Sequence, residues 1–453
     1  MTILKEYVLA VTDRQGTYKD AEAYYEGDVA EVFASQRLRS ALRSTAGNRS
    51  TLNFCRPVVD AVLNRLELGN IQGTTKAATS KIGEIFQNNQ LYLDANEIHR
   101  RALEFGDCYA IVWPDETGEI EVSYNSPRGM ALVYDAESPR KKLYAVKMWN
   151  DSAKSSRMNV YFDNRIEKYS VNNASPTEGS NWALIEVVEN EFGEVPVFHF
   201  RTHRPFGRPE HMDMYDAQDY INKEFIQSMI TIDYQGAPQR YALTEAGQSS
   251  ELDDFNEDDT ARENTNGLKN GPGEMWLLNG FKSVGEFKPA NPDVFWSPIK
   301  DTVRAAASLT NTPLHYFEKT GNVPSGEALR AAEAPLIKKV RNRAASFGQT
   351  WREIFIFALK IEGIASDVEV QWKEVESLDE TERWDIVLKK RNAGISLQQV
   401  MRETGYDAEL IEKIVEEAQV ERESGQVAGY DRGRTVRTST TNNATTPVTE
   451  DTE

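Results

Sequence analysis

One unbroken helical pattern in the last third of the chain restricts the possible folds more than any other feature. Apolar residues recur every three or four positions from Ser325 to about Glu362. They are Leu329, Ala332, Leu336, Val340, Ala344, Phe347, Trp351, Phe355 and Leu359. Such a helix would extend for about 57 Å. Pro335 lies inside it and removes one backbone hydrogen bond, so we predict a long supporting helix with a kink at Pro335.

Helices are also predicted for residues 20–105. Apolar residues between Phe54 and Leu66 repeat with helical spacing, and Gly69 is suited to end that helix. A further helical pattern from Leu91 to Phe105 stops at Gly106, where the apolar period changes from that of a helix to that of a strand.

The segment after Gly106 has the pattern of a β unit. Short runs of β-favouring residues alternate with Gly, Pro, Asn and Asp, which favour turns. The predicted strands are 108–113, 119–124, 130–134, 143–149, 157–161, 166–170, 182–188 and 197–200. We expect a mostly antiparallel arrangement, and a polar loop at 201–209 marks the end of this unit.

Two helices separated by an insertion are predicted next. The first covers 213–234, and Ser297–Pro298 is suited to begin the second, which continues to about Leu309. Predicted strands at 239–243, 275–278 and 283–287 flank or follow a polar, acidic stretch. Small residues at 305–308 give the second helix a thin face, which suits either close packing between subunits or ordinary packing within one chain.

The C-terminal part combines one strand with short helices. A strand is predicted at 368–375, followed by helices that begin at Asp379, Ser396 and Asp407. Residues 424–453 contain almost no apolar side chains, so we predict a disordered tail. Helical segments together with antiparallel strands predict an α+β fold.

The charge balance excludes one large class of function. The 453 residues carry a formal net charge of -19, which argues against a protein that binds nucleic acid tightly over its whole surface. The same charge is compatible with a conduit for DNA, because few phosphate contacts leave the DNA free to slide.

Neither export nor membrane insertion is signalled by the sequence. No run of about 18 apolar residues is present, and the first residues lack a basic start followed by an apolar stretch. Both cysteines, Cys55 and Cys108, lie in apolar stretches, so we predict buried thiols, consistent with a reducing cytoplasm.

Residues suited to catalysis or metal binding are scarce. His199 and His203 flank a predicted strand and a proline-containing loop, where their spacing does not place two imidazoles together. The segment from Gly321 to Ala328 has the glycine spacing of a phosphate-binding loop, but Glu327 stands where a lysine is needed. We therefore predict no ATPase activity, no metal and no cofactor.

An acidic cluster in the insertion has two possible interpretations. It consists of Glu251, Asp253, Asp254, Glu257, Asp258 and Asp259, with Glu263 beyond. It lacks the glycine and the closing glutamate of a calcium loop, so it is either a solvated acidic loop or a docking surface for a basic partner.

The order of segments resembles the portal protein family of tailed double-stranded DNA bacteriophages, in the branch common in phages of Gram-positive hosts. The segments with this resemblance are YYEGD at 24–28, NFCRPVVDAV at 53–62, the run 101–115, VPVFHF at 195–200, TPLHYF at 312–317 and PSGEAL at 324–329. Together they cover about residues 20–422. The resemblance predicts a portal-like fold and no catalysis.

The resemblance also implies a division of the chain. It gives a wing at 1–210 together with the long helix at 325–364, stem helices at 211–236 and 295–311, a clip at 237–294, a tunnel loop at 312–324, a crown at 365–423 and a tail at 424–453. About twelve copies would form a ring around a channel at the capsid vertex, with head-to-tail contacts. Assembly would take place in the host cytoplasm.

By the same resemblance the ring would package and eject the genome as a head-tail connector in the virion. Its partners would be the terminase large subunit, the major capsid and scaffold proteins, the head-tail adaptor, and double-stranded DNA in the channel. His315, Lys319 and Asn322 would face that DNA, although Lys319 also fits a merely solvated lysine. Two alternatives to a portal protein remain. One is a phage head-completion or adaptor protein, and the other is a terminase or nuclease component.

Overall fold

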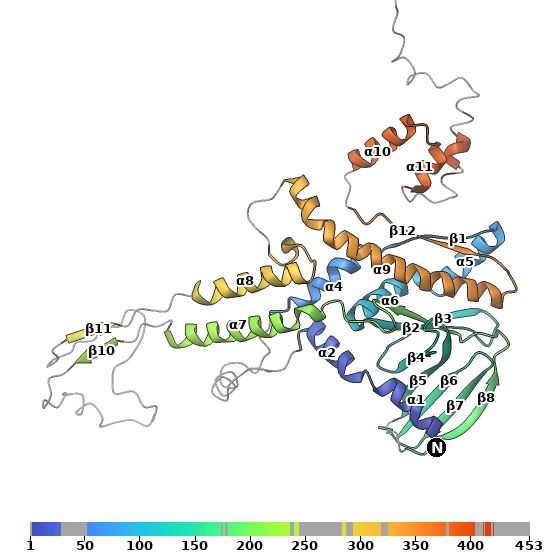
Figure 1. Cartoon of the computed structure of the whole chain (residues 1–453), viewed down its shortest axis with the longest axis horizontal. Coiled ribbons are helices and arrows are strands. Elements are labelled where there is room, and N and C mark those ends of the chain that lie inside the picture. The colour runs from blue at the N-terminus through green and yellow to red at the C-terminus, as the bar shows by residue number, and fades with distance from the viewer. Residues whose placement is uncertain are drawn as a thin grey trace, which may run out of the picture. The chain divides into compact units, whose positions relative to one another are not determined.

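The computed structural model describes residues 2–28, 52–152, 154–173, 175–176, 180–235, 240–243, 283–286, 293–318, 325–376, 380–403, 411, 413–417 and 420. The chain divides into two compact units, residues 1–376 and residues 377–453. Helices and sheets both contribute to the first unit, so the mixed helix and sheet composition predicted from the sequence is confirmed (Figure 1).

Among the described residues, five helices precede the main sheets in the chain. Their bounds are α1 Thr2–Thr12, α2 Gln15–Glu26, α4 Cys55–Leu63, α5 Lys76–Asn88 and α6 Leu91–Phe105. The hydroxyl of Thr75 accepts a hydrogen bond from the Ala78 amide and caps α5. Helix α6 ends at Gly106, whose φ of 86° is left-handed, so the predicted stop at this glycine is confirmed.

The predicted role of Gly69 as a helix end is wrong. Helix α4 already ends at Leu63, and Gly69 lies in strand β1, Leu68–Gly73, which pairs antiparallel with β12, Val368–Trp372. A Cβ at Gly69 would lie 2.9 Å from the Gln371 carbonyl oxygen. The glycine is therefore required by the close approach of β12, and that strand lies too far away in sequence for a local pattern to show it.

Two antiparallel sheets form the middle of the first unit. The three-stranded sheet has the order β3 (Ile120–Asn125), β2 (Asp107–Pro114), β9 (Val197–Arg201). The five-stranded sheet contains β4 (Met130–Tyr134), β5 (Lys142–Ser152), β6 (Ser155–Tyr161), β7 (Arg165–Val171) and β8 (Ala183–Glu189) in chain order. Strands β4 and β8 are its two edges.

Strand β2 is buried on both faces and separates two cores. Cys108 and Ala110 point into the core that α6 and α9 share, whereas Tyr109 and Ile111 point into the core beneath the five-stranded sheet. Helix α1 covers the other face of the five-stranded sheet. Both faces of β2 are buried, so its apolar run is continuous instead of alternating.

Helix α9, Gly326–Ile361, confirms the long helix predicted from the sequence. The hydroxyl of Ser325 accepts a hydrogen bond of 3.3 Å from the Ala328 amide at its start. Its buried face includes Leu336, Val340 and Phe347. This face packs into the core that α9 shares with α6, which we call the first core. Pro335 lies inside α9, which continues on both sides of it, and the kink at Pro335 stays a prediction.

Helices α7, Tyr215–Gln235, and α8, Asp293–Leu309, lie side by side (Figure 1). The predicted start of α8 at Ser297–Pro298 is wrong, because the helix already begins at Asp293. An acidic side chain in the first turn is favourable there, and Pro298 lies inside the helix, where it donates no backbone hydrogen bond and its ring crowds the carbonyl of Val294. Between these helices, β10 (Arg240–Leu243) pairs antiparallel with β11 (Ser283–Glu286).

The described part of the second unit is helical. Helix α10 spans Glu380–Asn392 and α11 spans Leu397–Glu403, and Ser396 caps α11 by accepting a hydrogen bond from the Gln399 amide. Val387, Val400 and Ile411 are buried. Strand β12 pairs with β1 of the first unit, although the sequence grouped residues 365–423 together.

A neutral histidine lies at the centre of the first core. His99 of α6 is fully buried and accepts a hydrogen bond of 2.9 Å from the Trp351 indole nitrogen of α9. Its ring stacks on Phe347 at 5.4 Å. Burial lowers the pKa of His99 from 6.5 to about 3, because the charged imidazolium would be desolvated there.

This burial predicts a loss of stability in mild acid. The unfolded chain takes up a proton at residue 99 below about pH 6.5 and the folded chain does not, so stability falls as pH drops from that value. His99→Gln keeps an acceptor for Trp351 but does not titrate. Thermal melting between about pH 7 and about pH 5 should therefore depend less on pH in His99→Gln than in the wild type. Identical pH slopes would contradict the assignment.

Candidate functional site: the base of the predicted channel loop

The structure describes only some of the residues predicted to act in the channel. His315 lies in a short 3-10 helix, Leu314–Tyr316, that follows α8. Lys319 and Asn322 lie outside the described residues, and so do Glu251, Asp253, Asp254, Glu257, Asp258 and Asp259. His315 is therefore the one predicted channel residue whose surroundings can be stated.

His315 lies next to an ion pair between Arg65, which follows α4, and Glu333 of α9. Its Nε2 is 3.5 Å from Oε1 of Glu333, which belongs to the start of α9. The same Glu333 oxygen accepts a hydrogen bond of 2.8 Å from Arg65. Arg65 also donates to the Tyr316 hydroxyl at 3.1 Å and to the Val375 carbonyl at 2.8 Å. One guanidinium thus joins the segment after α4, the 3-10 helix, α9 and the segment after β12.

A second ion cluster fixes the start of the helix pair. The carboxylate of Glu210 is almost fully buried and lies 2.8 Å from Lys339 and 2.7 Å from Arg343, both on α9. Lys339 also donates to the Thr310 carbonyl at 2.9 Å, just after α8. Burial raises the pKa of Glu210, but the two cations outweigh it and the net shift is downward. Glu210 therefore stays ionised.

The first turns of α7 are held by polar contacts to the N-terminal part of the chain. Gln218 accepts a hydrogen bond of 2.7 Å from the Phe54 amide, and the Tyr24 hydroxyl donates to Asp219 at 2.9 Å. The rings of Tyr24 and Tyr215 are stacked with centroids 3.8 Å apart. These contacts orient α7 relative to α2 and α4.

Helices α7 and α8 bury one side against each other and expose another. Ile221, Ile299, Val303 and Ala306 form their shared core with Cys55, a buried thiol as predicted. Tyr220 of α7 and Val294, Trp296 and Leu309 of α8 remain exposed, and Val294 and Leu309 each retain 66% of their surface. Val294 and Trp296 lie two positions apart in α8 and therefore project from different sides of that helix.

The histidines examined for metal binding are bonded within the protein. Nε2 of His199 lies 2.8 Å from the buried carboxylate of Asp107, and its Nδ1 lies 3.0 Å from the Tyr134 hydroxyl. His203 contacts the Thr202 hydroxyl. Within the described ranges, no group of three or more His, Cys, Asp or Glu side chains could hold a metal ion.

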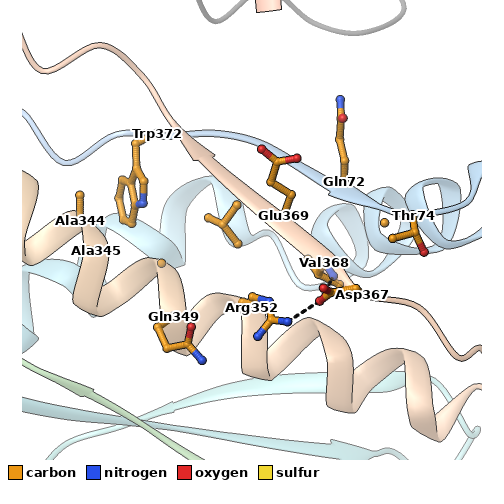
Figure 2. A pocket seen from close by; sticks show the side chains of 13 residues that line it. Gln72, Thr74, Ala344, Ala345, Gln349, Arg352, Asp367, Val368, Glu369 and Trp372 are labelled. Atoms are coloured by element: carbon orange, nitrogen blue, oxygen red, sulfur yellow. Dashed lines mark hydrogen bonds and ion pairs between the residues drawn. The ribbon is translucent and has the colours of Figure 1, made fainter. Parts of the chain in front are cut away.

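A surface groove of about 600 Å³ separates α9 from the β1 and β12 ribbon (Figure 2). Arg352 of α9 crosses it to bind Asp367 at 2.6 Å. Gly348 is required on its floor, because a Cβ there would lie 2.9 Å from the Trp372 indole nitrogen. None of the described residues that line this groove is a histidine or a cysteine, and it contains none of the predicted site residues.

Sequence patterns did not reveal Arg65, Glu210, Glu333, Lys339 or Arg343. The spacing of Lys339 and Arg343 places them on one face of α9, which is visible in the sequence. Their shared partner Glu210 lies 133 residues before Arg343, in a loop with no motif. Only the folded structure brings these groups together.

The chain matches the family model described as phage portal protein, SPP1 Gp6-like, over residues 10–424. It belongs to this family. The family resemblance predicted from the sequence is therefore confirmed. Portal proteins of Mycobacterium phages D29 and L5 are each 33% identical to this portal-family chain over 79 residues, which is 17% of its length and 16% of theirs. The matched segment is thus about a sixth of each relative.

Three solved structures are similar to this portal-family chain. A chain in the virion of a native gene transfer agent particle has a TM-score of 0.45 and 13% identity, and the alignment covers 86% of this chain and 99% of that one. A chain in the neck of the empty particle, computed with C6 symmetry, has 0.47 and 14%, covering 83% and 95%. A chain in the neck of the native particle, computed with C12 symmetry, has 0.45 and 13%, also covering 83% and 95%.

The Glu210 cluster predicts a large stability cost when its carboxylate is removed. Glu210→Gln leaves Lys339 and Arg343 partly buried without their anion, which should lower the free energy of unfolding by about 3 kcal/mol. Asp213→Asn breaks the exposed pair with Arg208 nearby and is the matched control, with an expected loss of about 1 kcal/mol or less. Chemical denaturation of both variants measures this difference, and equal losses would contradict the role of Glu210.

Proposed function

We propose that this chain is the ring-forming portal subunit of a tailed phage, which surrounds the channel for genome packaging and ejection. The observation that carries the proposal is the match to the portal family over residues 10–424. The protein would act by geometry and by successive partner exchange, and would make or break no covalent bond.

The helix pair α7 and α8 supports ring formation. In a ring, each copy touches a neighbour on both sides through two different surfaces. Exposed apolar side chains on the pair, such as Val294 and Leu309, would be buried by such neighbours. We propose that these helices are the stem around the channel. In the described ranges, no helix is long and apolar enough to cross a membrane.

The division of the chain follows the same proposal. The wing would comprise 1–210 and 325–364, the stem 211–236 and 295–311, the clip 237–294, the tunnel loop 312–324, the crown 365–423 and the tail 424–453. The ion pairs of Arg65 and Glu210 would then fix the ends of the tunnel loop and of the stem on the wing. A loop with fixed ends can contact moving DNA without displacing the ring.

The proposed partners are those of a packaging vertex. The clip, with its acidic cluster at 251–259, would dock the terminase large subunit and later the head-tail adaptor. Wing and crown would face the major capsid and scaffold proteins and the packaged double-stranded DNA. About twelve copies would assemble in the host cytoplasm and remain at the capsid vertex of the virion.

Exposed apolar residues of α8 should determine whether rings close. Val294→Asp or Leu309→Asp places a charge where a neighbour would bury the side chain, so closed rings should become a minor species. Native mass spectrometry compares each variant with the wild type, for which we expect rings of about twelve subunits. Leu388→Asp changes an exposed leucine of α10 and is the control. A strictly monomeric or dimeric wild type would contradict the proposed function.

Lys319 tests the proposed contact of the tunnel loop with DNA. Lys319→Glu replaces a cation that would touch phosphate by an anion that repels it, so rings should still form while the yield of packaged genomes falls. Lys319→Arg retains the charge and should package normally. Normal packaging by Lys319→Glu would show that this charge has no role in the loop.

A further inference from the structure

The 3-10 helix after α8 rests on two different cores. Leu314 and Phe317 pack against the shared core of α7 and α8, whereas Tyr316 packs against the first core. These three side chains belong to one short turn, in which the Phe317 amide donates to the Leu314 carbonyl at 2.9 Å. A displacement of the helix pair, or of the residues that follow Phe317, therefore also displaces the Tyr316 hydroxyl.

Arg65 links that hydroxyl to a distant segment of the chain. Its guanidinium donates to the Tyr316 hydroxyl at 3.1 Å, to Glu333 at 2.8 Å and to the Val375 carbonyl at 2.8 Å. Only 10% of the Arg65 side chain is exposed, so water does not fully compensate a donor that loses its partner. The donors of a guanidinium lie in one rigid plane. The group therefore cannot turn to follow Tyr316 without changing its geometry toward Val375.

The segment that contains Val375 is the last part of the first unit. It continues from β12, and the Lys373 amide donates to the Glu67 carbonyl at 3.0 Å, two residues after Arg65. Val375 packs against the first core, and the unit ends at Glu376. The bond from Arg65 to Val375 thus acts on the end of the first unit, directly before the chain enters the second one.

Two interpretations of Arg65 make different predictions. If its bonds only stabilise the fold, each contributes by itself, and loss of the Tyr316 hydroxyl affects the 3-10 helix alone. If the rigid guanidinium shares one position among three partners, loss of one partner changes the bonds to the other two, and substitutions at 65 and 316 are not additive. The common plane of the donors and the low exposure of Arg65 favour the second interpretation.

We propose that Arg65 couples the 3-10 helix Leu314–Tyr316 to the segment 373–376, so that loosening one of them loosens the other. The coupling itself is a property of the folded chain. Its use rests on the proposed function, in which the loop that follows the 3-10 helix contacts moving DNA and the second unit forms the crown. A contact at the loop would then be passed to the chain that enters the crown.

Removal of one hydroxyl tests the coupling. Tyr316→Phe deletes an acceptor of Arg65 but keeps the ring that packs on the first core. Amide hydrogen exchange at 373–376 should become about fivefold faster, although the substitution lies in the 3-10 helix. Made in the Arg65→Gln background, Tyr316→Phe should add nothing at 373–376. Hydrogen–deuterium exchange of the purified full chain, read by mass spectrometry, measures these differences, and thermal unfolding checks that each variant is folded.

A second tyrosine provides the matched control. Tyr24→Phe removes a hydroxyl that donates to Asp219 at 2.9 Å, next to α7, and should leave exchange at 373–376 as in the wild type. Arg65→Lys separates charge from shape, because lysine keeps a positive charge for Glu333 but cannot direct a planar fork at three acceptors. Exchange should therefore rise at both 314–318 and 373–376 in Arg65→Lys.

The outcomes separate the coupling from the ring function. Unchanged exchange at 373–376 in Tyr316→Phe, an equal increase with and without Arg65, or wild-type exchange in Arg65→Lys would each overturn the coupling and leave the ring function intact. A wild type that forms no rings would overturn the proposed function, and the exchange measurements on the folded chain would still decide the coupling.

Discussion

The packing of one long helix determines how the rest of the first unit is arranged. The buried face of α9 contacts helices α4 and α5, the three-stranded sheet and β12, and these elements share one core with α6. Its polar positions add the pairs of Glu333 with Arg65 and of Glu210 with Lys339 and Arg343. The same helix thus supplies the apolar core and the charged groups that position the helix pair and the base of the loop.

The buried carboxylates show how polar groups are used inside this fold. Asp107 accepts hydrogen bonds from Tyr18 at 2.9 Å and from the Gly207 amide at 2.6 Å, besides its contacts with Arg14 and His199. Burial raises the pKa of Asp107, but these partners outweigh it and keep the carboxylate ionised. Asp107 and Glu210 therefore join distant segments with directional bonds, which fix angles that apolar packing alone leaves adjustable.

Local sequence patterns predicted what depends on local structure. Helices α6, α7 and α9 and the strands of the two sheets follow from the apolar period and from turn residues such as Gly106. The sequence did not predict β1, whose partner β12 lies about three hundred residues later, and it placed the start of α8 at Pro298 because proline favours a first turn. It named His315 through a family resemblance but gave no sign of Glu333 beside it. Contacts between distant segments depend on the whole fold, which a local pattern does not contain.

The central claim is that copies of this chain close into a ring whose channel is surrounded by α7 and α8. An electron cryo-microscopy map of the purified, assembled wild-type protein at a resolution that separates helices tests it most directly. The account predicts a closed ring of about twelve copies with the α7 and α8 pairs around the central channel. Open filaments, twofold dimers, or a ring in which these helices point away from the axis would contradict it.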